Sequence, residues 1–156
     1  MHDSYHCGAR SPVIRDATEG DIAQVVSLGH DAFDRGGYDS FVSFDPLSAA
    51  RSARAFMESQ NVAFVVIDHN RLVGMAAALI APLYFNHAER LAQEIFWWIE
   101  PEHVRETSDL ISALEKSARE KGATVMMIPA LTASAGRLYR RMGYSPMEHY
   151  HMKVLT

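Results

Sequence analysis

The stretch LAQEIFWWIEPEHVRETSDLISALEKSAREKGATVMMI, residues 91–128, decides how this chain folds. It opens with Leu91–Ile99, whose aromatic and β-branched residues are typical of a strand. Pro101 ends that run, and a helical pattern occupies Ser108–Lys121. The short apolar run Thr124–Ile128 then indicates a buried central strand. Strand, helix and strand in this order predict two parallel strands joined by a crossover helix.

The residues before this stretch begin with helices. Val13–Arg15 fits a short strand, and Thr18 offers an N-cap for a helix that Gly36 ends. A second helix starts at Asp45, which can cap it, and Pro46, which suits the first helical position. Its predicted apolar face is Leu47, Ala50, Ala53 and Met57.

Two extended runs follow the second helix. Val62–Asp68 and Leu72–Tyr84 predict strands, and residues 69–71 predict the turn between them. Residues 86–88 predict a second turn, which leads into Leu91–Ile99. These three strands form an antiparallel meander.

The end of the chain predicts one more helix and one more strand. Ala133–Met142 has helical spacing and ends at Gly143, and Ser145–Leu155 is predicted to close the sheet. The fold class is therefore α/β, with a mixed, mostly antiparallel central sheet and helices on both faces. Residues 1–11 are expected to form a mobile arm, and residues 12–156 a single domain.

Composition excludes several classes of function. The chain has 156 residues, enough for one domain, and no apolar run near the roughly 20 residues that cross a bilayer. Its net charge is −4 without a basic block, which argues against nucleic-acid binding. Cys7 is the only cysteine, and no secretory signal is visible, so we expect a cytoplasmic protein without an intramolecular disulfide.

Three segments carry a resemblance to a known family. They are EIFWWIEPEH at Glu94–His103, the helix Leu110–Gly122, and AGRLYRRMGY at Ala135–Tyr144. Together with the element order, they resemble the GCN5-related N-acetyltransferase (GNAT) family from about Val13 to Leu155. The third segment resembles the Leu-Tyr-x-x-x-Gly-Phe ending of that family. The first is similar to phage-encoded members.

The resemblance implies direct transfer of an acetyl group from acetyl-coenzyme A to a primary amine. Glu94 would remove the proton from the amine, and Tyr139 would protonate the leaving thiolate, since the pKa of a phenol lies near that of a thiol. By strand alternation, Glu94, Phe96 and Trp98 are expected on one face. From the residues alone, Glu94 is equally readable as a solvated carboxylate, and Tyr139 as a packed residue with its hydroxyl at the surface.

The resemblance also implies binding residues. Those expected to hold acetyl-coenzyme A are Phe96, Trp97, Trp98, Ile99, Val104, Arg105, Thr107, Ser108, Asp109, Thr132 and Arg137. Those expected to line the acceptor pocket are Phe33, Tyr38, Phe41 and His87. We expect no metal, although His149 and His151 would share a face of the last strand. The open edge of that strand offers a surface for a homodimer.

One segment departs from the family. The family holds the pyrophosphate with a glycine-rich loop, whereas residues 104–109 contain no glycine and two acids, Glu106 and Asp109. Thr107 or Ser108 is equally readable as a helix cap. Thr132 stands where the family often has an asparagine. An alternative function is therefore that of a degenerate member, a binding or interaction protein with weak or no affinity for coenzyme A.

Overall fold

The structure is a computed structural model, and it describes residues 11–155. All but the last residue of the predicted N-terminal arm, and with it Cys7, lie outside the described residues. Within residues 11–155, no helix combines the length and the apolar character that a membrane span requires.

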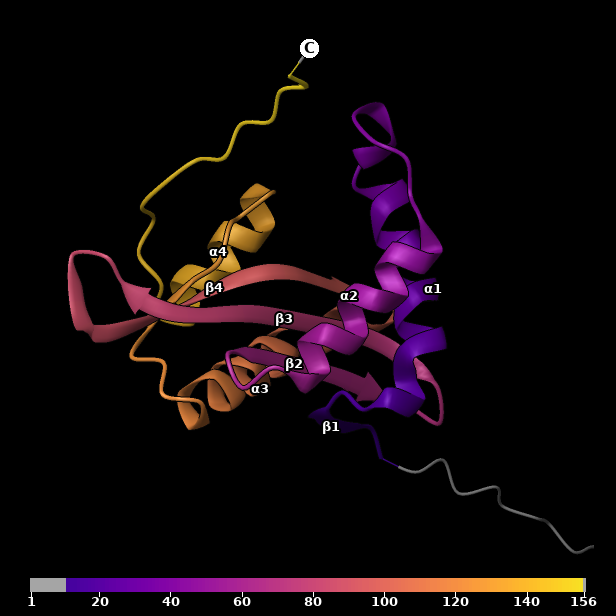
Figure 1. Cartoon of the computed structure of the whole chain (residues 1–156), viewed down its shortest axis with the longest axis horizontal. Coiled ribbons are helices and arrows are strands. Elements are labelled where there is room, and N and C mark those ends of the chain that lie inside the picture. Colours follow the sequence, from indigo (N-terminus) through magenta and orange to yellow (C-terminus); the bar gives the residue numbers. More distant parts are fainter. Residues whose placement is uncertain (1–10, 156) are drawn as a thin grey trace, which may run out of the picture.

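One five-stranded sheet forms the centre of the molecule (Figure 1). Its strands are β1 (Val13–Asp16), β2 (Val62–Asp68), β3 (Leu72–Leu83), β4 (Asn86–Ile99) and β5 (Val125–Met127). They lie side by side in chain order. Neighbours are antiparallel except β4 and β5, which are parallel. The predicted mixed sheet, with its parallel pair, is confirmed.

Helices cover both faces of the sheet, as predicted. The α-helices are α1 (Ile22–Arg35), α2 (Pro46–Glu58), α3 (Thr107–Glu120) and α4 (Ala133–Arg141). Three short 3-10 helices join them, η1 (Glu19–Asp21), η2 (Tyr38–Ser40) and η3 (Pro101–Glu106). The helices α1 and α2 pack on one face, and α3 packs on the other.

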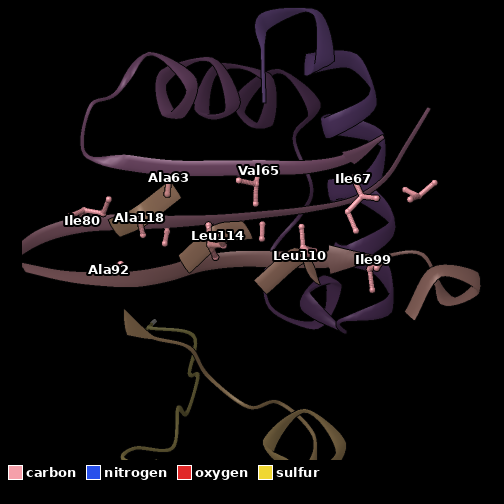
Figure 2. Close-up of a cluster of buried hydrophobic side chains, with 12 residues drawn as sticks. Ala63, Val65, Ile67, Ile80, Ala92, Ile99, Leu110, Leu114 and Ala118 are labelled. Carbon is pink, nitrogen blue, oxygen red and sulfur yellow. The ribbon is translucent and has the colours of Figure 1, made fainter. Parts of the chain in front are cut away.

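The face covered by α3 carries the larger core. Figure 2 shows Leu110, Leu114 and Ala118 of α3 in one cluster with side chains of β2, β3 and β4. These three residues, with Ile111, are buried and form the apolar face of this helix. Burying a leucine or isoleucine side chain, as at Leu110, Ile111 and Leu114, stabilises the fold by about 1.5–3 kcal/mol.

The opposite face is covered less completely. Val25 and Leu28 of α1 and Ala53 of α2 are buried against the sheet. Leu47, predicted on the apolar face of α2, is 68% exposed, because it lies in the first turn, where α2 has not yet reached the sheet. The apolar face of α2 is thus shorter than its sequence pattern predicts.

An ion-pair cluster fastens β1 to the start of α1. Arg15 donates to both oxygens of Asp21 at 2.7 and 2.9 Å and to Asp68 at 2.9 Å. Asp21 also accepts from the backbone and the hydroxyl of Thr18. Hydrogen bonding to Arg15 lowers the pKa of Asp21 despite its burial.

The β3–β4 hairpin differs from the prediction. The turn lies at residues 84–85, and residues 86–88, predicted as the turn, already belong to β4. The cause is that β3 and β4 pair as far as Leu83 and Asn86. The hairpin is therefore longer than expected and extends past the rest of the sheet (Figure 1).

The predicted last strand is absent from the described residues. Residues 145–155 form no strand and leave the sheet as an extended segment (Figure 1). The prediction of a strand over Ser145–Leu155 was wrong, and so was the placement of His149 and His151 on one. The apolar side chains of this segment stay exposed, Met147 and Leu155 among them, so burial does not favour pairing with β5.

Candidate active site

The strands β4 and β5 separate partway along β4. They pair only through Leu91–Gln93 and Val125–Met127. Beyond this point β4 continues for six residues, Glu94–Ile99, with β3 on one side alone. Within the described residues, no residue of Glu94–Ile99 is paired with β5. We call this divergence the fork. Backbone N–H and C=O groups along its β4 side are free to bind an extended, amide-containing ligand.

A β-bulge lies where the fork opens. The pairing passes from Glu94 with Ala78 to Phe96 with Ala77, so Ile95 has no partner on β3. Since Ala78 faces α3, Glu94 faces α3 too, whereas Phe96 packs on the α1 and α2 face. The expectation that Glu94, Phe96 and Trp98 share a face was wrong, because one extra residue reverses the alternation.

Glu94 is half-buried at the fork. Burial disfavours the charged carboxylate and raises the pKa of Glu94 from its ordinary value of 4.5 to about 7. At neutral pH the group is thus divided between its acid and base forms. A general base is most effective when its pKa lies near the working pH.

Tyr139 of α4 lies on the same side of the sheet. Its side chain is 4% exposed, and its buried phenol oxygen has no hydrogen-bond partner. Burial, with the nearby charge of Glu94, raises the pKa of Tyr139 to about 12, although the indole of Trp97 acts in the opposite direction. Its pKa therefore lies above that of a thiol, which corrects the expected match. The phenol stays protonated at neutral pH and can donate a hydrogen bond.

The unpartnered phenol indicates a ligand position. A buried polar group without a partner costs about 1–3 kcal/mol. That cost is removed when a substrate atom accepts the hydrogen bond. Acetyl-coenzyme A ends in a thioester on an amide-containing arm, so the free edge of β4 and the Tyr139 hydroxyl both suit that end of the molecule.

The region expected to hold the pyrophosphate is different from the family pattern. Of residues 104–109, the first three end the 3-10 helix η3 and the last three begin α3. The His103 N–H donates to Glu100, and both the N–H and the hydroxyl of Thr107 donate to the Val104 carbonyl. These donors are engaged within the chain, so they are not free for phosphate. The residues present thus fit the pantetheine end of acetyl-coenzyme A better than its diphosphate.

The other predicted binding residues have varied surroundings. Thr132 caps α4, accepting from the Ala135 N–H at 3.1 Å. Arg137 is exposed and donates to Ser134 at 2.9 Å. Among the rest, Val104, Arg105 and Asp109 are exposed, Ser108, Trp97 and Trp98 are half-buried, and Ile99 is buried.

The predicted acceptor residues fall into two places. Phe33 of α1 stacks on Tyr38, and its ring also contacts Phe44. Phe41 follows in the same segment and is 42% exposed. His87 lies seven residues of β4, about 23 Å at 3.3 Å per residue, from Glu94 and so does not reach the fork.

Sequence reading also missed a tyrosine beside the fork. The Tyr150 hydroxyl lies 3.4 Å from the Gln93 amide nitrogen and 3.3 Å from the Met127 sulfur. Gln93 and Met127 are the last paired residues of β4 and β5. The sequence gives no signal for this contact, because Tyr150 belongs to a segment without regular structure.

The fold is shared with several acetyltransferases of known structure. An acetyltransferase of Trypanosoma brucei is 18% identical, with a TM-score of 0.72, over 93% of this chain and 100% of that chain. The structure of AAC(6')-Iy in complex with the bisubstrate analog CoA-S-monomethyl-acetylneamine is 12% identical, with a TM-score of 0.74, over 94% and 99%. A predicted acetyltransferase of Clostridium acetobutylicum, solved with acetyl-CoA, is 16% identical, with a TM-score of 0.70, over 92% and 96%.

The sequence itself identifies the family. No curated protein matches it. Residues 13–147 match the family described as "Acetyltransferase (GNAT) domain", and this range contains the fork, Glu94 and Tyr139. The chain therefore belongs to the GNAT acetyltransferase domain family.

Proposed function

We propose that this protein is an N-acetyltransferase that moves an acetyl group from acetyl-coenzyme A directly to a primary amine. One observation carries the proposal. The strands β4 and β5 diverge beside a half-buried carboxyl group whose pKa is about 7 and a buried phenol without a partner. A base and a hydrogen-bond donor thus lie beside a free strand edge.

The roles follow from the chemistry of aminolysis. Glu94 removes a proton from the amine, directly or through water, so that the neutral nitrogen can attack the thioester carbonyl. Backbone N–H groups of Phe96–Ile99 hold the pantetheine arm and stabilise the oxyanion. The carbon–sulfur bond then breaks, and Tyr139 donates to the leaving thiolate. No cysteine among the described residues offers a covalent route, which favours direct transfer.

The proposed acceptor is a class of molecules, primary amines, rather than one compound. The aromatic group of Phe33, Tyr38 and Phe41 supports a small molecule or a protein amine that presents an apolar surface to it. Structural neighbours include aminoglycoside acetyltransferases and a glucosamine-6-phosphate N-acetyltransferase. A cytoplasmic location, a homodimer and the similarity to phage-encoded members stay predictions.

Calorimetry with acetyl-coenzyme A, followed by thiol release in the presence of a panel of primary amines, tests the proposal. We expect binding by the wild-type protein and turnover with at least one amine. Glu94→Gln should bind acetyl-coenzyme A but lose turnover, by about 10²–10⁴-fold for a general base. Absence of binding at millimolar acetyl-coenzyme A would refute the enzymatic assignment.

A second candidate function rests on η3. Since the N–H groups of His103 and Thr107 bond within the chain, they do not contribute to holding a diphosphate, which favours weak affinity for it. Such a protein would act as a binding or interaction module on the same fold. It is distinguished by the same calorimetry, because it predicts no binding of acetyl-coenzyme A.

A further inference from the structure

Two histidines and a glutamate meet at one end of the sheet, away from the fork. His69 lies in the turn between β2 and β3, and His103 and Glu106 belong to η3. The His69 Nε2 atom is 2.9 Å from one Glu106 oxygen, and the His103 Nδ1 atom is 3.0 Å from the other. The two imidazole rings are 4.5 Å apart at an interplanar angle of 60°.

The spacing of these atoms suits a metal ion. One ligand atom from each residue lies within 4.8 Å of the other two. Ligand atoms around a tetrahedral zinc ion, with bonds of about 2.0–2.1 Å, are roughly 3.4 Å apart. The two nitrogen–oxygen distances, 2.9 and 3.0 Å, each involve a different Glu106 oxygen, so both imidazole nitrogens already face this carboxylate. Imidazole and carboxylate together suit zinc and similar divalent ions.

The surroundings hold the three side chains in place. Asn70 adopts a left-handed conformation at φ 69°, and the His69 N–H donates to the Arg71 carbonyl, which fixes the turn. The positive charge of Arg71 is neutralised by Glu100, to which it donates twice at 2.6 Å. A neighbouring cation would repel a metal ion, and this one is already paired.

Partial exposure leaves room for water ligands. The side chains of His69, His103 and Glu106 are 26%, 23% and 21% exposed. They are thus accessible to an ion and still shielded on one side. Structural zinc sites usually have four protein ligands. Other zinc sites commonly have three protein ligands and leave the fourth position open to water.

We propose that His69, His103 and Glu106 bind one divalent transition-metal ion of the zinc class. The ion joins the β2–β3 turn to η3, and Glu106 is also the residue that precedes α3. The bound ion therefore holds the start of α3 against the sheet. Glu94 lies five residues before the end of β4, about 17 Å from that end, so this ion has no part in acetyl transfer.

Zinc titration by calorimetry tests the proposal. Because His2, His6 and Cys7 can bind zinc by themselves, all proteins carry H2A, H6A and C7A. We expect one ion per chain, a higher melting temperature with zinc, and a visible absorption spectrum with Co²⁺ as a substitute. H69A, H103A and E106Q should each weaken zinc binding by at least about tenfold, since each removes a ligand.

His30 supplies a matched control. Its Nε2 atom lies 3.8 Å from Asp34 on an exposed helix face, a histidine–carboxylate pair without a second histidine, so H30A should bind zinc like the parent. Circular dichroism without zinc verifies that each variant is folded. The proposal is overturned if the parent binds no zinc at tenfold excess, or if the double variant H69A/H103A binds as tightly as the parent. Neither result bears on acetyl transfer.

Discussion

The substitution Glu94→Gln separates the catalytic role of this residue from its cost to stability. Burial raises the pKa of Glu94 from 4.5 to about 7, so the folded state holds its proton more tightly than the unfolded state. Each tenfold change in proton affinity is worth about 1.4 kcal/mol, which gives about 3 kcal/mol as an upper limit for the cost of ionising Glu94 in the folded protein.

The direction of this effect with pH is fixed by linkage. Below pH 4.5 the carboxyl group is protonated in both states, and no cost arises. As the pH rises from 4.5 to about 7, the unfolded state ionises while the folded state keeps its proton, so the wild type loses stability relative to the variant. Above about 7 both states are ionised, and the difference stays constant. Glutamine is neutral at every pH and nearly the same size. Glu94→Gln should therefore be more stable than wild type at pH 8, by up to about 3 kcal/mol, and about equal to it at pH 4.

Urea unfolding of both proteins at several pH values measures the difference between their free energies of unfolding. In a protein of this size, about 3 kcal/mol corresponds to roughly 6–12 °C in melting temperature. The same variant should lose acetyl transfer at pH 8. The matched control is Glu89→Gln, on the same strand but outside the fork, which should change neither quantity. A Glu94→Gln variant that is equally stable at pH 4 and pH 8 would refute the reasoning about burial.

Three other predictions follow from the site and its supports. Tyr139→Phe should lower turnover while leaving the calorimetric affinity for acetyl-coenzyme A largely intact. It should not reduce stability, because the hydroxyl that it removes has no partner. An unchanged rate would remove Tyr139 from the mechanism. Acetyl-pantetheine should bind within roughly tenfold, about 1.4 kcal/mol, of acetyl-coenzyme A, since the donors of η3 are engaged within the chain; a much larger gap would show that the diphosphate is well held. Asp21→Asn should lower the free energy of unfolding at pH 7 by about 1–3 kcal/mol, because Arg15 loses its closest partner. Since the folded pKa of Asp21 lies below 3.8, the wild-type advantage in urea unfolding should be present above that pH and shrink as the pH falls through the folded pKa; an advantage independent of pH would contradict this.

The sequence predicts the layers of the fold well, because these layers follow from patterns among neighbouring residues. Period-2 and helical patterns are set by neighbouring residues, and those of β2, β3 and α3 are regular enough to read directly. The parallel pairing of β4 and β5 follows from the intervening helix. Val125–Met127 is shorter than the predicted strand, because only three residues find partners on β4.

Features that depend on contacts between residues far apart in the chain could not be predicted from the sequence. The bulge at Ile95 depends on the register between β3 and β4, and one extra residue moved Glu94 to the face of Tyr139. Ser145–Leu155 was predicted to close the sheet, but a strand requires a partner, and the free edge of β5 offers only three residues. The cluster of His69, His103 and Glu106 joins positions more than 30 apart in the chain, at no recognisable motif spacing.

The central claim is that the free edge of β4 at the fork holds the arm of acetyl-coenzyme A. A titration of the ¹⁵N-labelled protein with coenzyme A, followed through backbone amide chemical shifts, tests it most directly. The claim predicts the largest shifts at Phe96–Ile99 and in α4 around Tyr139. Saturable shifts confined to other parts of the chain, with Phe96–Ile99 unchanged, would contradict it.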